Sequence, residues 1–373
     1  MFADLLGTLR APSPEVDEDG RTHTRYHRLT RLPSFGAHRH LIASGDAPEI
    51  DIESRVVDGF SEALELLEEG ELDMVALPAT MLHGKQAEML AAGCEVVGAR
   101  APRRPNLILV SENKIAYQPK SAFILAEHKN VRRQLRRARR GLRVLGPVAY
   151  AAISEFDSPP SDPLLLTEWM EDLRQNGEID GYITSRAIYD ELEIGGRRHA
   201  LLPDPKDRGG AHFLPLPYAD LVILMARRRF PNSITEQIAE PEGNTSWWVQ
   251  DQLISGLSED MLERTAVLVR HRHVRSLMKQ AEEHKDIALE QSCHDTEGEV
   301  LDDDVHVEIR LEVVSKDGHR SLGLDRLIGH AEYQYATISM LRDWEVLVRE
   351  ASRPVPKDFY TDIEAPVYID LDE

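Results

Sequence analysis

The residues best suited to bind a ligand lie in an arginine-rich segment that begins at Asn130. Arg132 and Arg133 stand near the start of a predicted helix, residues 131–140, which carries four more arginines. A guanidinium group can chelate a carboxylate through two parallel, charge-assisted hydrogen bonds. The run could instead be a solvated helix face or a nucleic-acid patch. We expect the arginines from Arg136 to Arg140 to be solvated, and Arg132 and Arg133 to contact the ligand.

The two cysteines are far apart in the sequence and form no disulfide framework, which indicates a reducing compartment. Cys94 follows Ala-Ala-Gly and precedes Glu-Val-Val, so we expect a small core residue that leads into a strand. Cys293 ends the segment 281–293 and has two interpretations, an inert loop thiol or a reactive one.

The fifteen histidines do not predict a metal site. His271-Arg-His273 and His38-Arg-His40 lack the spacing of a helical metal site, and no pair of cysteines accompanies them. Glycine-rich phosphate loops and the nucleophile elbow of serine hydrolases are also missing from the sequence. Nucleotide binding and serine-hydrolase chemistry therefore lose support.

The elements that must position these residues alternate between strand and helix. Strands are predicted at 27–32, 49–57 and 72–76, with a helix at 60–69 that ends at Gly70. The same alternation of strand and helix is predicted again, with a strand at 122–126, the helix at 131–140 and a strand at 142–145. After residue 258 the predicted elements are helices, an antiparallel strand at 305–315 and a final helix at 332–351. Two α/β domains and a small C-terminal α+β domain are predicted.

The predicted domain boundaries follow these changes. Residues 1–21 are expected to be a mobile leader, 22–118 with 211–230 the first α/β domain, and 119–210 the second. Residues 231–258 are a linker or insertion, 259–353 the C-terminal domain with Cys293, and 354–373 an acidic tail. Two α/β domains joined by two chain crossings form a hinged pair with a cleft, where small molecules usually bind.

Composition limits the partners. The 373 residues carry a net charge of −21, which argues against nucleic acids and anionic membranes. The N-terminal segment is acidic and its apolar run is too short for a signal peptide. No stretch approaches the roughly 20 apolar residues needed to span a bilayer. We expect a cytoplasmic monomer whose partner is a small molecule.

Several motifs resemble the hydroxymethylbilane synthase (porphobilinogen deaminase) family. The segment from Ala281 to Cys293 matches, without a gap, its helix that runs into Leu-Glu-Gly-Gly-Cys. Asn130-Val-Arg-Arg-Gln resembles its Ser-Leu-Arg-Arg-Gln, and Thr30-Arg31 resembles its Thr-Arg-x-Ser. Residues 71–76 resemble its strand before a Lys-Asp pair, and 214–222 resemble its Leu-Pro-Ala-x-Gly-Gln-Gly-Ala strand. The resemblance covers most of residues 22–350 at low identity.

The resemblance implies two periplasmic-binding-protein-like α/β domains with a cleft between them and a small C-terminal domain. It also implies a transferase of porphyrin and haem biosynthesis that polymerises porphobilinogen to a linear tetrapyrrole and releases ammonia. Cys293 would hold a dipyrromethane cofactor, because a thiolate can attack an activated pyrrole methylene. Arg31, Arg132 and Arg133 would bind the carboxylates of the substrate.

Departures from the family lie at its catalytic positions. Thr80-Met81 stands where the family has Lys-Asp, so Met81 occupies the position of the usual aspartate. Asp73, or else Asp220, could supply the missing acid, and Asp73 is the catalytic residue that we predict. The alternative functions are an inactive homologue that binds a small polycarboxylate or a tetrapyrrole, and a periplasmic-binding-type domain without a tetrapyrrole link.

Overall fold

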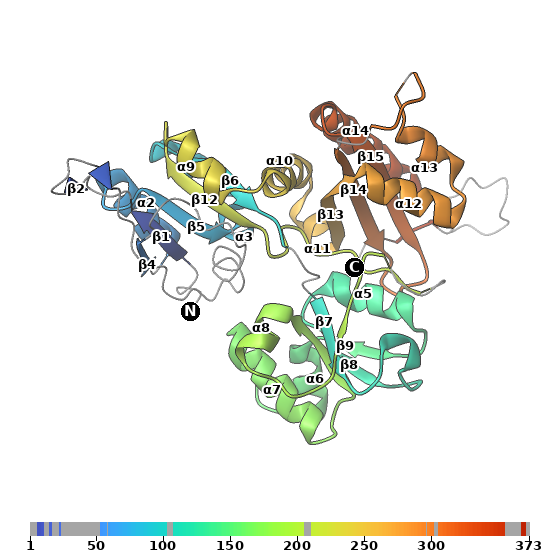
Figure 1. Ribbon diagram of the computed structural model, residues 1–373. Coiled ribbons are helices and arrows are strands. Elements are labelled where there is room, and N and C mark those ends of the chain that lie inside the picture. Colours follow the sequence, from blue (N-terminus) through green and yellow to red (C-terminus); the bar gives the residue numbers. More distant parts are fainter. Residues whose placement is uncertain are drawn as a thin grey trace. The chain divides into compact units, whose positions relative to one another are not determined.

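The computed structural model divides into two compact units. Figure 1 labels the helices and strands of the chain. Unit 1 comprises Met1–Glu127, Gly141–Leu202 and Tyr218–Trp247, and unit 2 comprises His128–Arg140, Pro203–Pro217 and Trp248–Glu373. The structure describes residues 6–10, 15–16, 22–23, 53–57, 59–102, 107–204, 210–295, 297–301, 305–354 and 367–370.

The first sheet of unit 1, sheet A, has five strands in the order β4-β1-β5-β12-β6. Their bounds are β1 Leu6–Arg10, β4 Glu53–Val57, β5 Met74–Pro78, β6 Cys94–Arg100 and β12 Val222–Arg227. The helices nearby in sequence are α2 Phe60–Glu69, α3 Ala79–Leu82, α4 Gln86–Ala91 and α9 Asn232–Ile238. β12 is antiparallel to both β5 and β6, so the carboxyl ends of β5 and β6 lie at the edge where β12 begins. The segments β5 and β12 are almost wholly buried because both are continuous apolar runs.

The second sheet of unit 1, sheet C, has the strand order β11-β7-β10-β8-β9. Its strands are β7 Leu107–Ser111, β8 Phe123–Leu125, β9 Arg143–Leu145, β10 Gly181–Ser185 and β11 Arg198–Ala200. Its helices are α6 Pro147–Ser154, α7 Pro163–Gln175 and α8 Arg186–Glu191, and the 3-10 helix η1 spans Ile115–Tyr117. A short two-stranded sheet pairs β2 Glu15–Val16 with β3 Thr22–His23.

Unit 2 is built on sheet D, in which β13 Thr265–His273, β14 Val305–Val314 and β15 Ser321–Gly329 are antiparallel. The helices of its chain segments are α5 Lys129–Ala138, α11 Glu259–Arg264, α12 Val274–His284, α13 Ile287–Ser292 and α14 Tyr333–Ala351. The helix α10, Pro241–Ser255, begins in unit 1 and ends in unit 2.

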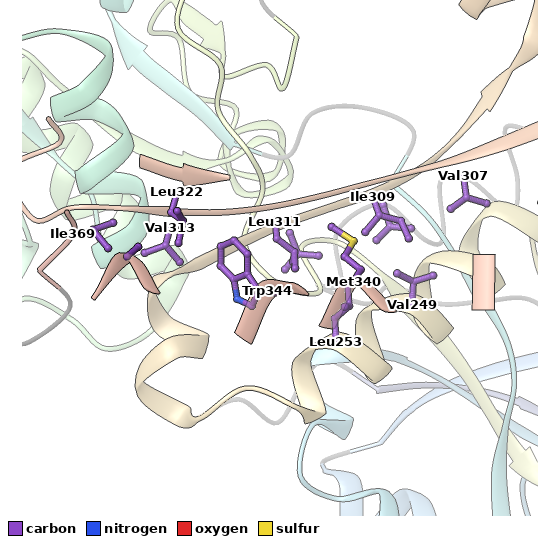
Figure 2. Packing of buried hydrophobic residues seen from close by; sticks show 13 residues of the cluster. Val249, Leu253, Val307, Ile309, Leu311, Val313, Leu322, Met340, Trp344 and Ile369 are labelled. Atoms are coloured by element: carbon purple, nitrogen blue, oxygen red, sulfur yellow. The ribbon is translucent and has the colours of Figure 1, made fainter. Parts of the chain in front are cut away.

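One face of sheet D forms an apolar core (Figure 2). Val307, Ile309 and Leu311 of β14 pack there with Met340 and Trp344 of α14, all of them at most 1% exposed. Successive side chains of a strand point to opposite faces, so the alternating polar residues of β14 form the other face. The core is therefore the product of the period-two pattern that the sequence shows at 305–315.

The other face of sheet D is charged and largely buried. Glu308 accepts from Arg270 Nε at 2.7 Å and Arg272 Nη1 at 2.8 Å, and it pairs with Arg310. Burial would raise the pKa of Glu308, but these guanidinium groups outweigh it and hold the pKa below the ordinary value. A buried carboxylate that is paired in this way stabilises a unique packing of the face.

The structure corrects several predicted boundaries. The predicted mobile leader, residues 1–21, contains β1, which pairs with both β4 and β5. The first domain was predicted to extend to residue 118, but β7 lies in sheet C. The predicted linker 231–258 forms α9 and α10, and in the predicted tail Ile369 is 1% exposed in the core of unit 2. The predicted strand 27–32 lies outside the described residues.

The α/β class with a C-terminal α+β part, as predicted, is confirmed. Among the described residues, no helix has both the length and the apolar character needed to cross a bilayer.

Candidate functional site

The carboxyl edge of sheet A brings together three chain segments. Val222, the first residue of β12, is in register with Pro78 at the end of β5 and with Arg100 at the end of β6. The backbone N–H of Ala79 donates to the carbonyl of Leu221 at 2.8 Å. The turn that precedes β12 therefore lies against the start of α3. In open α/β sheets this edge, beyond the carboxyl ends of the strands, is where ligands bind.

That turn has an unusual backbone. The N–H of Leu221 donates to the carbonyl of Tyr218 at 3.1 Å and closes the turn. Tyr218 has φ 58° and Asp220 has φ 53°, both in the left-handed region that favours glycine. Left-handed residues other than glycine are uncommon and tend to collect at functional sites, where the surrounding structure holds them. The backbone thus marks this turn as a constrained feature.

Three aromatic rings meet at the turn. The ring of Tyr218, which is 3% exposed, lies 5.9 Å from that of His83 and 5.7 Å from that of Trp247 between centroids. The Tyr218 and Trp247 rings are stacked, with 30° between their planes. Stacked and tilted ring pairs add stability beyond the area that they bury, so the three side chains support one another.

The first turn of α10 fixes Trp247 in place. Glu240 N–H donates to the Ala99 carbonyl at 2.9 Å, and Asn244 Oδ1 accepts from Ala99 N–H at 2.7 Å. A Cβ at Gly243 would lie 2.3 Å from the Ala99 carbonyl oxygen. Glycine is therefore required for the close approach of α10 to β6, which positions Trp247 one turn later.

Two polar groups at this edge have no hydrogen-bond partner among the described residues. The Nδ1 atom of His83 is buried and has no hydrogen-bond partner among the residues that the structure describes. Within the same residues, the Asp220 carboxylate makes no hydrogen bond or ion pair. Burial of this carboxylate raises the pKa of Asp220 to about 7, although the residue as a whole keeps an exposed surface. A buried polar atom without a partner, such as His83 Nδ1, is rare in folded proteins, whereas water can reach the exposed residue Asp220.

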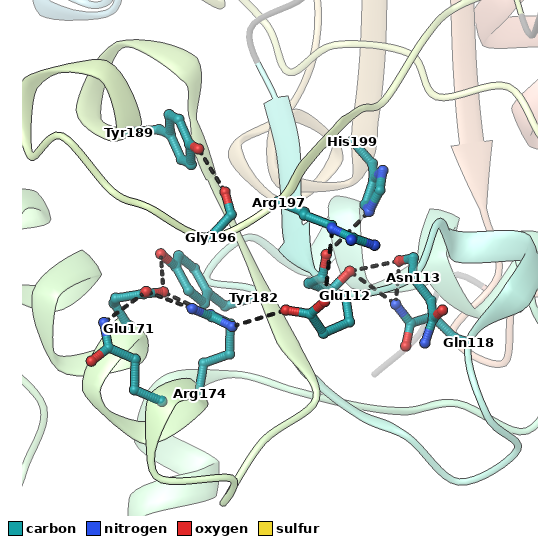
Figure 3. Close-up of polar contacts among 12 residues, drawn as sticks. Glu112, Asn113, Gln118, Glu171, Arg174, Tyr182, Tyr189, Gly196, Arg197 and His199 are labelled. Atoms are coloured by element: carbon teal, nitrogen blue, oxygen red, sulfur yellow. Dashed lines mark hydrogen bonds and ion pairs between the residues drawn. The ribbon is translucent and has the colours of Figure 1, made fainter.

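A polar cluster in sheet C differs because its members satisfy one another (Figure 3). Glu171 of α7 accepts from Arg174 Nε at 2.8 Å, from Gln175 at 3.0 Å and from the Tyr182 hydroxyl at 3.0 Å. Burial would raise the pKa of Glu171, but these hydrogen bonds outweigh it and lower the pKa. Burial also raises the pKa of the Tyr182 hydroxyl. This cluster attaches α7 to β10 and leaves no group for a ligand.

The predicted catalytic acid lies at the opposite edge of sheet A. Asp73 immediately precedes β5, and its Oδ1 accepts from Arg227 Nη2 at 3.1 Å. Thr80 and Met81 lie in α3, at the same edge as Asp220. Of the two acids considered from the sequence, Asp220 is therefore the one near the position where the family has its Lys-Asp pair.

The predicted ligand-binding arginines belong to unit 2 or to undescribed residues. Arg133 is 3% exposed and its Nη1 donates to the Val314 carbonyl at 3.1 Å. Arg132 is half-buried. Arg137, which was expected to be solvated, pairs with Glu312 and donates to the His212 carbonyl at 2.7 Å. Arg31 lies outside the described residues. Ligand binding by Arg31, Arg132 and Arg133 stays a prediction.

Cys293 is fully buried and packs with Val274 and Leu277. Burial raises the pKa of its thiol, against a smaller opposite effect of the Ser292 hydroxyl. A neutral thiol in an apolar cluster is a poor nucleophile. The dipyrromethane attachment at Cys293 stays a prediction. Cys94 is also buried, at 0% exposure.

Among the described residues, no three His, Cys, Asp or Glu side chains are grouped so that they could hold a metal ion.

Sequence reasoning missed His83 and Tyr218. The only signal for the turn was Asp220, which drew attention as a possible replacement acid. A left-handed tyrosine gives no signature in a single sequence.

The comparisons with known proteins are limited to slight structural likeness. No family model matches the chain, and no curated protein matches it. A periplasmic substrate-binding protein of an ABC transporter from Coxiella burnetii is 11% identical, with a TM-score of 0.29 over 58% of this chain and 89% of that one. The periplasmic aliphatic sulphonate binding protein SsuA from Escherichia coli is 14% identical, with a TM-score of 0.29 over 84% of each chain. Immunogenic lipoprotein A from Vibrio vulnificus is 10% identical, with a TM-score of 0.32 over 58% of this chain and 96% of that one.

These comparisons contradict three predictions. The deaminating transferase, the place in porphyrin biosynthesis and the cytoplasmic location find no support in these comparisons and are not kept, and two of the three solved chains named above are binding proteins of the periplasm. The burial of Cys293 gives a physical reason, because the proposed cofactor thiol is not in a reactive environment. At TM-scores of 0.29–0.32, the likeness carries no statement about the ligand or the compartment of this chain.

Proposed function

We propose that the chain binds a small molecule at the carboxyl edge of sheet A, next to His83, Tyr218 and Asp220. The observation that supports this proposal is a turn with two left-handed residues, Tyr218 and Asp220, beside the buried His83 Nδ1, which has no partner among the described residues. A ligand group that donates to the Asp220 carboxylate would favour its ionised form, which burial disfavours.

The function is binding, as in the alternative of an inactive homologue that the sequence left open. The arrangement holds a carboxyl group, an imidazole and stacked rings, which together can recognise a small organic molecule by shape, charge and hydrogen bonds. Among the described residues at this edge, no hydrogen bond joins a nucleophile to a base that could activate it.

A thermal-shift screen of small molecules on the full chain tests the proposal. A ligand present at one hundred times its Kd stabilises the folded state by about 2.7 kcal/mol, which a melting curve resolves. We expect compounds that stabilise the wild type and lose this effect in Asp220→Asn and in His83→Phe, which keeps a ring beside Tyr218.

The matched control is Asp172→Asn, which changes an exposed carboxylate of α7 that makes no side-chain hydrogen bond or ion pair among the described residues. This variant should respond as the wild type does. If stabilising compounds act equally on all variants, or if no compound stabilises the wild type, the proposal is wrong.

A further inference from the structure

We infer that two copies of this chain associate through the outer face of α14, with the two helices antiparallel about a two-fold axis near Arg342. The inference departs from the monomer expected from the sequence. It is carried by apolar side chains that are exposed on this face and by the order of the charges between them. The outer face consists of six exposed residues: Tyr335, Ile338, Arg342, Glu345, Val346 and Arg349.

The outer face lies on the side of α14 that is turned away from the core of unit 2. Met340 and Trp344 of the inner side belong to that core, as Figure 2 shows. Since an α-helix has 3.6 residues per turn, the six outer residues fall within an arc of about 100° opposite these side chains. Positions 335, 338, 342, 345 and 349 follow the alternating spacing of three and four residues that is typical of a seam between two helices.

The outer face carries more apolar surface than a solvated helix face needs. Tyr335 is 82% exposed, Ile338 is 51% exposed and Val346 is 47% exposed. The outer side of a helix that packs on a core is usually polar. Single exposed apolar residues need no explanation, but these three lie on one stripe about 16 Å long. A partner that covers the stripe would remove this apolar surface from water.

A second copy of the same helix fits the stripe when it runs antiparallel. In a pair centred on Arg342, residues at equal distances before and after this position meet across the axis. Ile338 of each copy then meets Val346 of the other, which buries both apolar side chains. Tyr335 meets Arg349 of the other copy, whose guanidinium group can lie over the ring. The face is therefore complementary to itself, as a two-fold interface requires.

The charges favour this arrangement over a parallel pair. Arg342 of each copy lies about one helical turn from Glu345 of the other copy, close enough for an ion pair. Among the described residues, Arg342 and Glu345 make no hydrogen bond or ion pair within the chain, so both are free for this contact. In a parallel pair each charge would instead face its own kind, which is unfavourable. The face has two arginines and one glutamate in a chain of net charge −21, so two acidic copies can approach here.

The association should be weak. A standard protein–protein interface has roughly 20–30 residues on each side, and this face has only six exposed residues. We expect a dimer whose dissociation constant lies between about 1 µM and 1 mM.

Sedimentation equilibrium of the full chain, at concentrations up to about 1 mM, tests the inference by a charge exchange. Arg342→Glu and Glu345→Arg should each weaken the dimer at least about tenfold, because each places like charges together. The double variant restores opposite charges and should return to within about threefold of the wild type. Ile338→Asp should also weaken the dimer. Val148→Asp is the matched control, since Val148 is 71% exposed in α6, and it should not weaken the dimer.

Disulfide cross-linking tests the direction of the pair. Arg342→Cys places two thiols near the axis, whereas the thiols of Arg349→Cys would be about 21 Å apart along the helices. The native Cys94 and Cys293 are both 0% exposed and do not compete. We expect mild oxidation to link Arg342→Cys and not Arg349→Cys. The inference is overturned if the wild type is monomeric at about 1 mM, if the double variant does not recover, or if Arg349→Cys is linked in preference to Arg342→Cys.

Discussion

The substitution Gly243→Ala tests how the first turn of α10 positions the candidate site. Two effects of opposite sign compete. Alanine is favoured over glycine in a helix by up to about 1 kcal/mol. The added Cβ, however, would lie 2.3 Å from the Ala99 carbonyl oxygen and 2.6 Å from the Arg100 Cα. Both atoms belong to the backbone of β6, so no side chain can rotate away.

The steric effect should dominate. Overpacking of a well-packed contact costs about 1–3 kcal/mol, and the upper part of this range applies when the backbone itself must shift. After the gain in helix propensity is subtracted, we expect the free energy of unfolding of Gly243→Ala to fall by about 1–2 kcal/mol. Because Trp247 is on the next turn, its stacking on Tyr218 should also be disturbed.

Urea unfolding and near-ultraviolet circular dichroism measure the two effects. The matched control is Gly195→Ala, where a Cβ would have no atom within 4 Å and the residue has no positive φ. Its stability should stay within about 0.5 kcal/mol of the wild type, as is usual for a surface substitution. If Gly243→Ala were as stable as the wild type with an unchanged aromatic signal, the reasoning on the α10 contact would be refuted.

Three further predictions concern charges. Arg137→Met should lower the stability of unit 2 by about 3 kcal/mol in urea unfolding, because it leaves the 6% exposed Glu312 carboxylate without its guanidinium partner, while the exposed Arg140→Met should change little. The melting temperature should fall as the pH drops from 6.5 towards 4 and should do so less in His271→Leu. Burial, His330 and His273 lower the pKa of His271 from 6.5 to about 4, so the folded state resists the protonation that the unfolded state accepts. Asp220→Asn should melt higher than the wild type, by a margin that widens between pH 4 and 7 and is constant above, because the folded state raises the pKa of this carboxyl and so disfavours its ionised form.

Periodic patterns predicted the elements that depend on local sequence. The helix Phe60–Glu69 was predicted at its observed bounds because Gly70, with φ 78°, supplies the left-handed cap that ends it. The strand pattern at 305–315 predicted β14 because its two faces differ in polarity. In both cases the signal lies within a dozen residues.

Features that depend on distant segments could not be predicted. The arginine-rich helix α5 was expected to serve a ligand and solvent, but Arg133 and Arg137 bind groups of unit 2 that lie about 180 residues away in the sequence. Residues 1–21 have a composition typical of a mobile leader. The strand β1 within them forms because it pairs with β4 and β5, which are distant in the sequence. Cys293 was singled out by its motif, which contains no information about the apolar side chains that bury it.

The candidate site was predicted in part. Asp220 was considered as a possible acid, but Asp73 was the catalytic residue predicted. The strand direction decides between them, since Asp73 lies at the amino end of β5 and Asp220 lies beside its carboxyl end. His83 approaches Tyr218 only because β5 and β12 are neighbours in sheet A.

The most direct test of the central claim is a carbon-13 NMR titration of the Asp220 side-chain carboxyl, assigned with Asp220→Asn, in the free chain and with a compound that stabilises the wild type in the thermal-shift screen. We predict that the pKa of this group is well above 3.8 in the free chain, and that saturation with such a compound changes it because the compound then lies beside the carboxylate. An ordinary pKa in the free chain that does not change with the compound would contradict the claim that this carboxylate belongs to the ligand-binding edge.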